Sequence, residues 1–200
     1  TMDVTQTHKV KRRLAVLIDI SESMSVSDHR KRPEEIVEAA VALGMLSLSD
    51  ATDANRAAMA LDAKQRQTIT AASRLELASS LLSQPARPAF DSLGDDLDVS
   101  YYAFGKKLDK LGEGKSVSGE NGTGDFLAAL QADEPGTSIA GSLEAVANSD
   151  RGVPLAGIVL ISDGLDTSSR RAEAAIRDLG TRGIPVYTVP VGIADPDDVS

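Results

Sequence analysis

Leu14–Met24 reads Leu-Ala-Val-Leu-Ile-Asp-Ile-Ser-Glu-Ser-Met. Its first five residues are all apolar, which is typical of a strand covered on both faces in a parallel sheet. The apolar run ends at Asp19, and hydroxyl groups follow at Ser21 and Ser23. Binding sites in such sheets gather at the carboxyl ends of the strands. Carboxylate and hydroxyl oxygens placed there are hard ligands of the kind that Mg²⁺ or Mn²⁺ prefers.

Length and composition indicate one globular domain. The chain has 200 residues, of which 42% are hydrophobic and 26% are charged, as in ordinary soluble proteins. A formal charge of −9 argues against binding to nucleic acid or to anionic membranes. The absence of cysteine excludes thiol chemistry, disulfides and thiolate zinc sites. The longest strongly apolar run, Leu155–Ile161, is far shorter than the roughly 20 residues of a membrane-spanning helix.

Hydrophobic periodicity predicts alternating strands and helices. That alternation is the pattern of an open, mostly parallel α/β sheet with helices on both faces. Two prolines in the last strand favour a position near the edge of the sheet. Residues 112–124 are rich in glycine and polar groups and are expected to form a loop. Strands are predicted at about 14–19, 97–104, 106–111, 155–162 and 184–191, and helices at about 33–48, 54–83, 125–132, 137–147 and 172–180.

Local clusters of basic residues occur at Lys9–Arg13 and at His29–Arg32. Most such runs are solvated faces of loops, and we interpret both clusters in that way. The two histidines, His8 and His29, lie in these polar segments, so we expect them to be solvated rather than catalytic.

A second buried strand also ends in an aspartate, Asp163, which Gly164 follows. A predicted helix begins at Thr137. If these points meet Asp19 at one edge of the sheet, the site contains two carboxylates and three hydroxyls.

With these motifs the sequence resembles a von Willebrand factor A domain, a three-layer α/β fold. The resemblance covers about residues 10–24 and 70–192, and three motifs in the right order make it specific. The matching segments are Asp19-Ile-Ser-Glu-Ser23 for the Asp-x-Ser-x-Ser motif, Gly136-Thr137 for the threonine position, Leu160-Ile-Ser-Asp-Gly164 for the second aspartate, and Gly183–Gly192 for the strand that follows.

The resemblance implies a metal-ion-dependent adhesion site. Ser21, Ser23 and Thr137 would be hydroxyl ligands of Mg²⁺, with Mn²⁺ or Ca²⁺ as alternatives, and Asp19 and Asp163 would act largely through water. Neutral direct ligands leave the charge of the cation poorly compensated, so it still attracts an anionic oxygen. Mg²⁺ prefers six oxygen ligands, and an Asp or Glu of a protein partner would supply the last. The expected function is metal-dependent protein binding.

The chain departs from the family in two places. Residues 25–69 form an extended, helical insertion that leaves the sheet directly after Ser23. We expect it to act either as a lid or recognition surface for an acidic partner, through the basic turn His29–Arg32, or as added scaffolding. The chain also stops before the closing helix of the family. It looks like a bacterial member, excised from a larger and sometimes membrane-attached protein. Its partner, compartment and oligomeric state stay open.

Two rival functions remain to be weighed. One is a structural scaffold of the same fold that binds without a metal. The other, a Mg²⁺-dependent phosphohydrolase, is disfavoured because haloacid-dehalogenase-type phosphatases need a second acid where this chain has Ser21. Gly114-Lys115-Ser116 resembles the end of a phosphate-binding loop, but Asp109 stands where the loop needs glycine. No Gly-x-Ser-x-Gly elbow occurs. We therefore do not expect an enzyme.

Overall fold

β1 (Arg12–Asp19) is the central strand of the sheet, as the opening stretch of sequence predicts. The computed structural model describes residues 11–84, 90, 93–114, 123–149, 152–169 and 171–193. Within these residues five strands form one sheet in the order β3-β2-β1-β4-β5. β1 pairs in parallel with β2 and β4, β4 pairs in parallel with β5, and β3 runs antiparallel to β2. The other strands are β2 (Leu97–Phe104), β3 (Leu108–Glu113), β4 (Leu155–Ser162) and β5 (Val186–Pro190).

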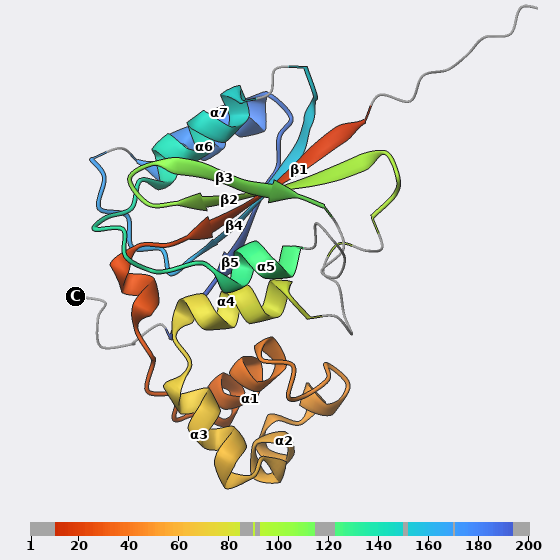
Figure 1. Ribbon diagram of the computed structural model, residues 1–200, viewed down its shortest axis with the longest axis vertical. Coiled ribbons are helices and arrows are strands. Elements are labelled where there is room, and N and C mark those ends of the chain that lie inside the picture. The colour runs from red at the N-terminus through yellow and green to blue at the C-terminus, as the bar shows by residue number, and fades with distance from the viewer. Residues whose placement is uncertain are drawn as a thin grey trace, which may run out of the picture.

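Helices cover both faces of the sheet and make a three-layer α/β structure (Figure 1). On one face, β1 contributes Ala15 and Leu17 to a core that includes Leu143 of α6 and Leu179 of α7. The described helices are α1 (Pro33–Ala42), α2 (Ala54–Ala60), α3 (Ala63–Ala71), α4 (Arg74–Leu82), α5 (Thr123–Ala128), α6 (Ile139–Asn148) and α7 (Ala172–Thr181), with short 3₁₀ turns η1 (Glu22–Ser25) and η2 (Asp50–Thr52).

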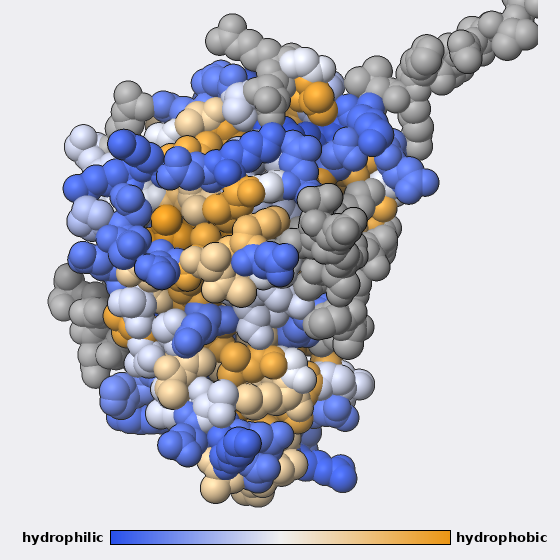
Figure 2. Space-filling view, in the orientation of Figure 1, coloured by the Kyte–Doolittle hydropathy of each residue, from blue (hydrophilic) through white to orange (hydrophobic). Residues whose placement is uncertain are grey.

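The opposite face of β1 is covered by α4 and α5. Val16 and Ile18 pack there against Leu75 of α4 and Leu127 of α5. Successive side chains of a strand point to opposite faces, so the uninterrupted apolar run of β1 serves both layers. Figure 2 shows hydrophilic residues along β3 and a band of hydrophobic residues where the sheet meets α4 and α5.

α1, α2 and α3 do not lie on the sheet. They pack on one another and against α4, on the side of α4 that faces away from the strands (Figure 1). Ala40 of α1, Ile69 of α3 and Leu77 of α4 share one apolar cluster there. α1 and α2 fall within residues 25–69, the segment predicted as an insertion, and α3 extends two residues beyond it. The bounds of the insertion stay a prediction.

Several predicted helix limits are wrong, for reasons of local capping. The single helical region predicted at 54–83 is three helices, because Asp62 and Ser73 each begin a new helix with a capping box. α1 ends at Ala42 rather than near residue 48, and Gly44 follows with a φ of 71°, a conformation that terminates helices. α5 begins and ends earlier than the predicted 125–132, and α7 extends one residue past Gly180. α6 begins at Ile139 with Ser138 as its N-cap, so Thr137 lies in the loop before the helix and not at its first residue as predicted.

Three strands also differ in their limits, and one of them is β5, which spans Val186–Pro190 rather than 184–191. β1 begins at Arg12, and β3 spans Leu108–Glu113 rather than 106–111. The later start of β3 follows from a tight turn in which the amide of Gly105 donates to the carbonyl of Lys107 at 3.0 Å. β3 therefore takes the first residues of the predicted 112–124 loop, while 115–122 lie outside the described residues. β5 lies at the edge of the sheet, as its prolines predict.

The interpretation of the basic clusters as solvated is wrong for two arginines. Arg13 is only 3% exposed, and its guanidinium donates to the hydroxyl groups of Tyr102 and Ser149. The side chain of Arg30 is 4% exposed and donates to the carbonyl of Ile69 at 2.7 Å. Both find acceptors that are distant in sequence, which composition does not reveal. His29 is exposed, as predicted, while His8 and Lys9 lie outside the described residues.

In the part of the chain that the structure describes, no helix has both the length and the apolar character needed to cross a bilayer.

Candidate metal centre

Asp19 and Asp163 lie at the carboxyl ends of the neighbouring parallel strands β1 and β4. Asp19 is fully buried, and its Oδ2 accepts a hydrogen bond of 2.6 Å from the hydroxyl of Ser162, the last residue of β4. The side chain of Asp163, one residue further, is 2% exposed. Its Oδ1 accepts from the amide of Leu165 at 3.0 Å. The two aspartates predicted from sequence therefore meet at one edge of the sheet.

Ser21 and Ser23 lie in the turn that directly follows β1. The amide of Ser21 donates to Oδ1 of Asp19 at 2.9 Å, so the carboxylate folds the chain back on itself. The short 3₁₀ turn η1 follows, and the fully buried Met24 anchors it in the core. The hydroxyl oxygens of Ser21 and Ser23 consequently lie 3.0 Å apart.

Thr137 is brought to the same edge by hydrogen bonds on both sides of its loop. On the β1 side, Ser21 forms a parallel bridge with Glu134, and the amide of Glu134 donates to the carbonyl of Ile20 at 3.1 Å. On the β4 side, the amide of Thr137 donates to Oγ1 of Thr167 at 2.9 Å. The loop of Thr137 therefore lies between the turns that follow β1 and β4, and Thr137 is 2% exposed.

The donor set has the chemistry that a hard divalent cation needs. Mg²⁺ binds six oxygens at 2.0–2.1 Å in an octahedron, which places adjacent ligands about 3.0 Å apart. The oxygens of Ser21 and Ser23 have that spacing, which is also the length of a hydrogen bond. Within the described ranges, no three His, Cys, Asp or Glu side chains converge as metal ligands, so a cation here would depend on hydroxyl groups. The ligand role of the five predicted residues stays a prediction.

Burial leaves negative charge at this centre poorly solvated. It raises the pKa of Asp19 above its ordinary value, and the neighbouring charge of Asp163 acts in the same direction. Hydrogen bonds from Ser162 and Ser21 oppose the rise without cancelling it. An ionised Asp19 therefore favours a cation nearby.

Arg74 is part of the site, although its sequence context gave it no role. Its Nη1 donates to Oδ2 of Asp163 at 2.8 Å, and its Nη2 donates to Oδ1 of Asp28 at 2.7 Å. Arg74 is the first residue of α4, where the helix dipole disfavours a positive charge. That unfavourable placement is the one sequence signal that marks Arg74 as held by acidic partners.

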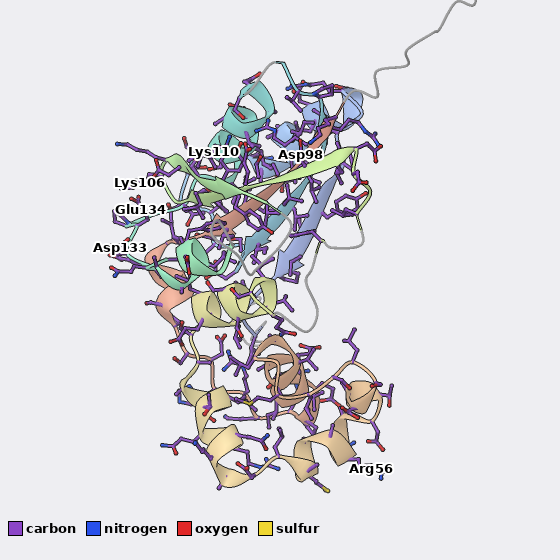
Figure 3. All side chains as sticks on the ribbon, turned by 45° about the vertical axis from the view of Figure 1, so that its right-hand side comes forward. Arg56, Asp98, Lys106, Lys110, Asp133 and Glu134 are labelled. Carbon is purple, nitrogen blue, oxygen red and sulfur yellow. The ribbon has the colours of Figure 1, made fainter. Side chains whose placement is uncertain are left out.

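Charged side chains of both signs, those of Lys106, Asp133 and Glu134, lie on one side of the molecule (Figure 3). Lys106 belongs to the turn between β2 and β3 and is exposed. Its Cε lies 3.1 Å from the point that a Cβ on Gly136 would occupy, next to Thr137. Asp133 and Glu134 project from the segment that leads to Thr137, on the same side of the molecule as Lys106 (Figure 3).

Comparison with solved structures confirms the fold. The chain is similar to an aerotolerance-related membrane protein from Bacteroides fragilis, with a TM-score of 0.54 and 20% identity, over 94% of this chain and 74% of that chain. The predicted class, a three-layer α/β fold with a mostly parallel central sheet and helices on both faces, is thereby shown. At this level of identity the likeness shows the fold alone.

Two weaker likenesses carry no argument about this chain. Manganese-loaded TRAP protein from Plasmodium vivax has a TM-score of 0.45 and 14% identity, over 94% of this chain and 60% of that chain. Proximal thread matrix protein 1 of the mussel byssus, with a zinc-occupied MIDAS motif, has a TM-score of 0.42 and 13% identity, over 90% of this chain and 38% of that chain. No protein-family model and no curated protein matches the sequence.

The raised pKa of Asp19 predicts a specific dependence of stability on pH. A carboxyl whose pKa is higher in the folded chain stabilises the fold at low pH, and that contribution is lost as pH rises through the folded pKa. The variant Asp19→Asn should therefore gain stability relative to the natural chain in EDTA as pH rises from about 4, near the pKa of an unfolded aspartate, through the raised pKa of Asp19 in the folded chain. Urea unfolding of both proteins across this range measures the difference. A difference that is independent of pH would contradict the assignment.

Proposed function

We propose that this chain is a protein-binding module that depends on a divalent cation, Mg²⁺ or alternatively Mn²⁺ or Ca²⁺. The observation that carries the proposal is the convergence at one sheet edge of the turn after β1, the loop of Thr137 and the turn after β4. It gathers Asp19, Ser21, Ser23, Thr137 and Asp163, residues that lie up to 144 positions apart by subtraction of their numbers.

The residues of the chain have distinct roles in this proposal. Ser21, Ser23 and Thr137 supply neutral hydroxyl ligands. Asp19 holds the amide of Ser21 and so fixes the turn that presents both serines. When bound, the cation supplies a positive charge that neutral ligands leave free to attract a carboxylate. The partner would provide that carboxylate from an Asp or Glu.

The charges around the centre suit an acidic partner that needs a cation. Lys106 and Lys107 are exposed at the turn between β2 and β3, beside the loop of Thr137. Asp133 and Glu134 lie on the same side, in a chain of formal charge −9. The two lysines only balance the charge of these two acids, so the neighbouring side chains give no net attraction and an incoming carboxylate gains most of its attraction from the bound ion.

The geometry favours binding over catalysis. Asp19, the residue that a phosphatase of the rival class would use as nucleophile, is fully buried, and both of its oxygens accept hydrogen bonds. A carboxylate held in this way is not presented to a substrate. We therefore infer that the module is not an enzyme.

A structural scaffold without a metal is the second candidate, and one observation favours it. The hydroxyl groups of Ser21 and Ser23 bond to each other, and Arg74 already neutralises Asp163. These polar side chains thus have partners within the chain and need no cation to satisfy them. The Bacteroides fragilis protein of the same fold is described as a membrane protein, and a larger, membrane-associated bacterial parent is the corresponding proposal for this chain.

A thermal unfolding experiment separates these two candidates. A ligand that binds only the folded chain stabilises it by about 2.7 kcal/mol at 100 times its dissociation constant. Mn²⁺ or Mg²⁺ should therefore raise the Tm of the natural chain, and Ser23→Ala should abolish most of that rise. Ser25→Ala is the matched control, because Ser25 lies in the same turn but donates only to the carbonyl of Glu22. A Tm unaffected by either ion would support the metal-free scaffold.

Water-proton relaxation with bound Mn²⁺ tests the open coordination position. An ion that keeps an exchangeable water should enhance relaxation, and a short peptide with a single Asp should lower that enhancement by replacing the water. The same peptide with Asn in place of Asp should have no effect. Equal effects of both peptides would contradict binding through a carboxylate.

A further inference from the structure

Arg74 lies between two buried acidic side chains from different parts of the fold. It contacts Asp163, which follows β4, at 2.8 Å. It contacts Asp28, in the segment before α1, at 2.7 Å through Nη2, and its Nε lies 3.2 Å from both oxygens of Asp28. The side chains of Asp28 and Asp163 are 7% and 2% exposed, and that of Arg74 is 15% exposed. These contacts are thus shielded from water, unlike surface ion pairs, which contribute little.

Asp28 connects this contact to α1–α3. The guanidinium of Arg30 lies 3.6 Å from Asp28, and it donates to the carbonyls of Ile69 in α3 and of Ala72. The amide of Arg74 donates to the carbonyl of Val26 at 3.0 Å, which holds the start of α4 on the same segment. One polar network therefore joins the end of β4 to the helices that lie away from the sheet (Figure 1).

Arg74 has little room to move independently of its surroundings. A Cβ placed on Gly192, just after β5, would lie 2.7 Å from Nε of Arg74. The backbone at Gly192 therefore packs directly on the guanidinium. A change in the position of Arg74 has to be accommodated by Gly192 or by Asp28.

A cation at the candidate centre and Arg74 would compete for the charge of Asp163. Without a metal, the carboxylate of Asp163 is paired with the guanidinium of Arg74. A cation bound nearby would repel that guanidinium and so weaken the ion pair. Thermodynamic linkage makes the effect reciprocal. If the cation weakens the contact between Arg74 and Asp163, that contact must in turn lower the affinity of the centre for the cation.

We propose that Arg74 is the internal counter-ion of Asp163, and that binding of a divalent cation loosens the attachment of α1–α3 to the metal-bearing edge. The attachment of α1–α3 therefore depends on whether the metal centre is occupied. This inference rests on the proposed function, because it requires that the centre binds a cation. Arg74 acts here as a positioning residue and not as a ligand.

The first test measures Mn²⁺ affinity by isothermal titration calorimetry in the natural chain and in Arg74→Gln. Removal of the competing charge should tighten binding by about 5-fold or more, the lower limit of typical coupling between sites. Arg32→Gln is the matched control, because Arg32 pairs with Glu35 on the exposed start of α1, and its substitution should leave the affinity unchanged. Equal or weaker binding by Arg74→Gln would overturn the proposal.

The second test measures hydrogen exchange in peptides that cover α1–α3, and it does not depend on affinity. Mn²⁺ should raise their exchange in the natural chain and leave it unchanged in Arg74→Gln. Asp28→Asn removes the other acidic partner of Arg74 and should also abolish the Mn²⁺-dependent rise in exchange. This variant replaces Arg74→Gln in the experiment if Arg74→Gln fails to fold. In EDTA, Asp163→Asn should raise exchange in the same peptides.

The outcomes separate the failure of this proposal from that of the proposed function. If Mn²⁺ does not bind the natural chain, the proposed function and the coupling both fail. If Mn²⁺ binds while exchange in α1–α3 stays constant, the coupling alone fails. If Asp163→Asn leaves exchange in EDTA unchanged, the contact between Arg74 and Asp163 does not hold α1–α3 in place, and the proposal is wrong.

Discussion

Burial of β1 on both faces is the constraint on which the rest of the structure depends. Because α6 and α7 cover one side and α4 and α5 cover the other, the stretch of β1 from Leu14 to Ile18 is apolar at every position. Asp19 stands at that end, and the parallel neighbour β4 ends beside it at Ser162. The hydrogen bond between these two residues fixes the position of the Asp19 carboxylate. The candidate metal centre is thus a consequence of where two apolar strands stop.

The sequence predicted the fold and the convergence at the sheet edge because both depend on local patterns. Apolar runs ending in Asp19 and Asp163 mark strands whose carboxyl ends meet in a parallel sheet. The break of the 54–83 region into three helices was missed, because this stretch contains no glycine or proline and the new helices begin instead at the polar caps Asp62 and Ser73. Whether the five predicted residues bind a cation is a separate question that the fold leaves open.

Buried arginines were the part of the structure that the sequence did not reveal. Arg13, Arg30 and Arg74 each donate to acceptors at long sequence distance, such as Ser149 for Arg13 and Asp163 for Arg74. Local composition instead favours solvated faces for basic clusters. Arg74 is the most consequential of the three, since it gives the candidate centre a counter-charge and connects it to α1–α3.

The central claim is that hydroxyl groups on separate loops share one hard cation at this edge. A crystal soaked in Mn²⁺ and measured for anomalous scattering tests it most directly, because the signal locates the ion without any assumption about its ligands. We expect a single strong peak within coordination distance of the hydroxyl oxygens of Ser21, Ser23 and Thr137. A peak elsewhere, or none at a saturating concentration of Mn²⁺, would contradict it.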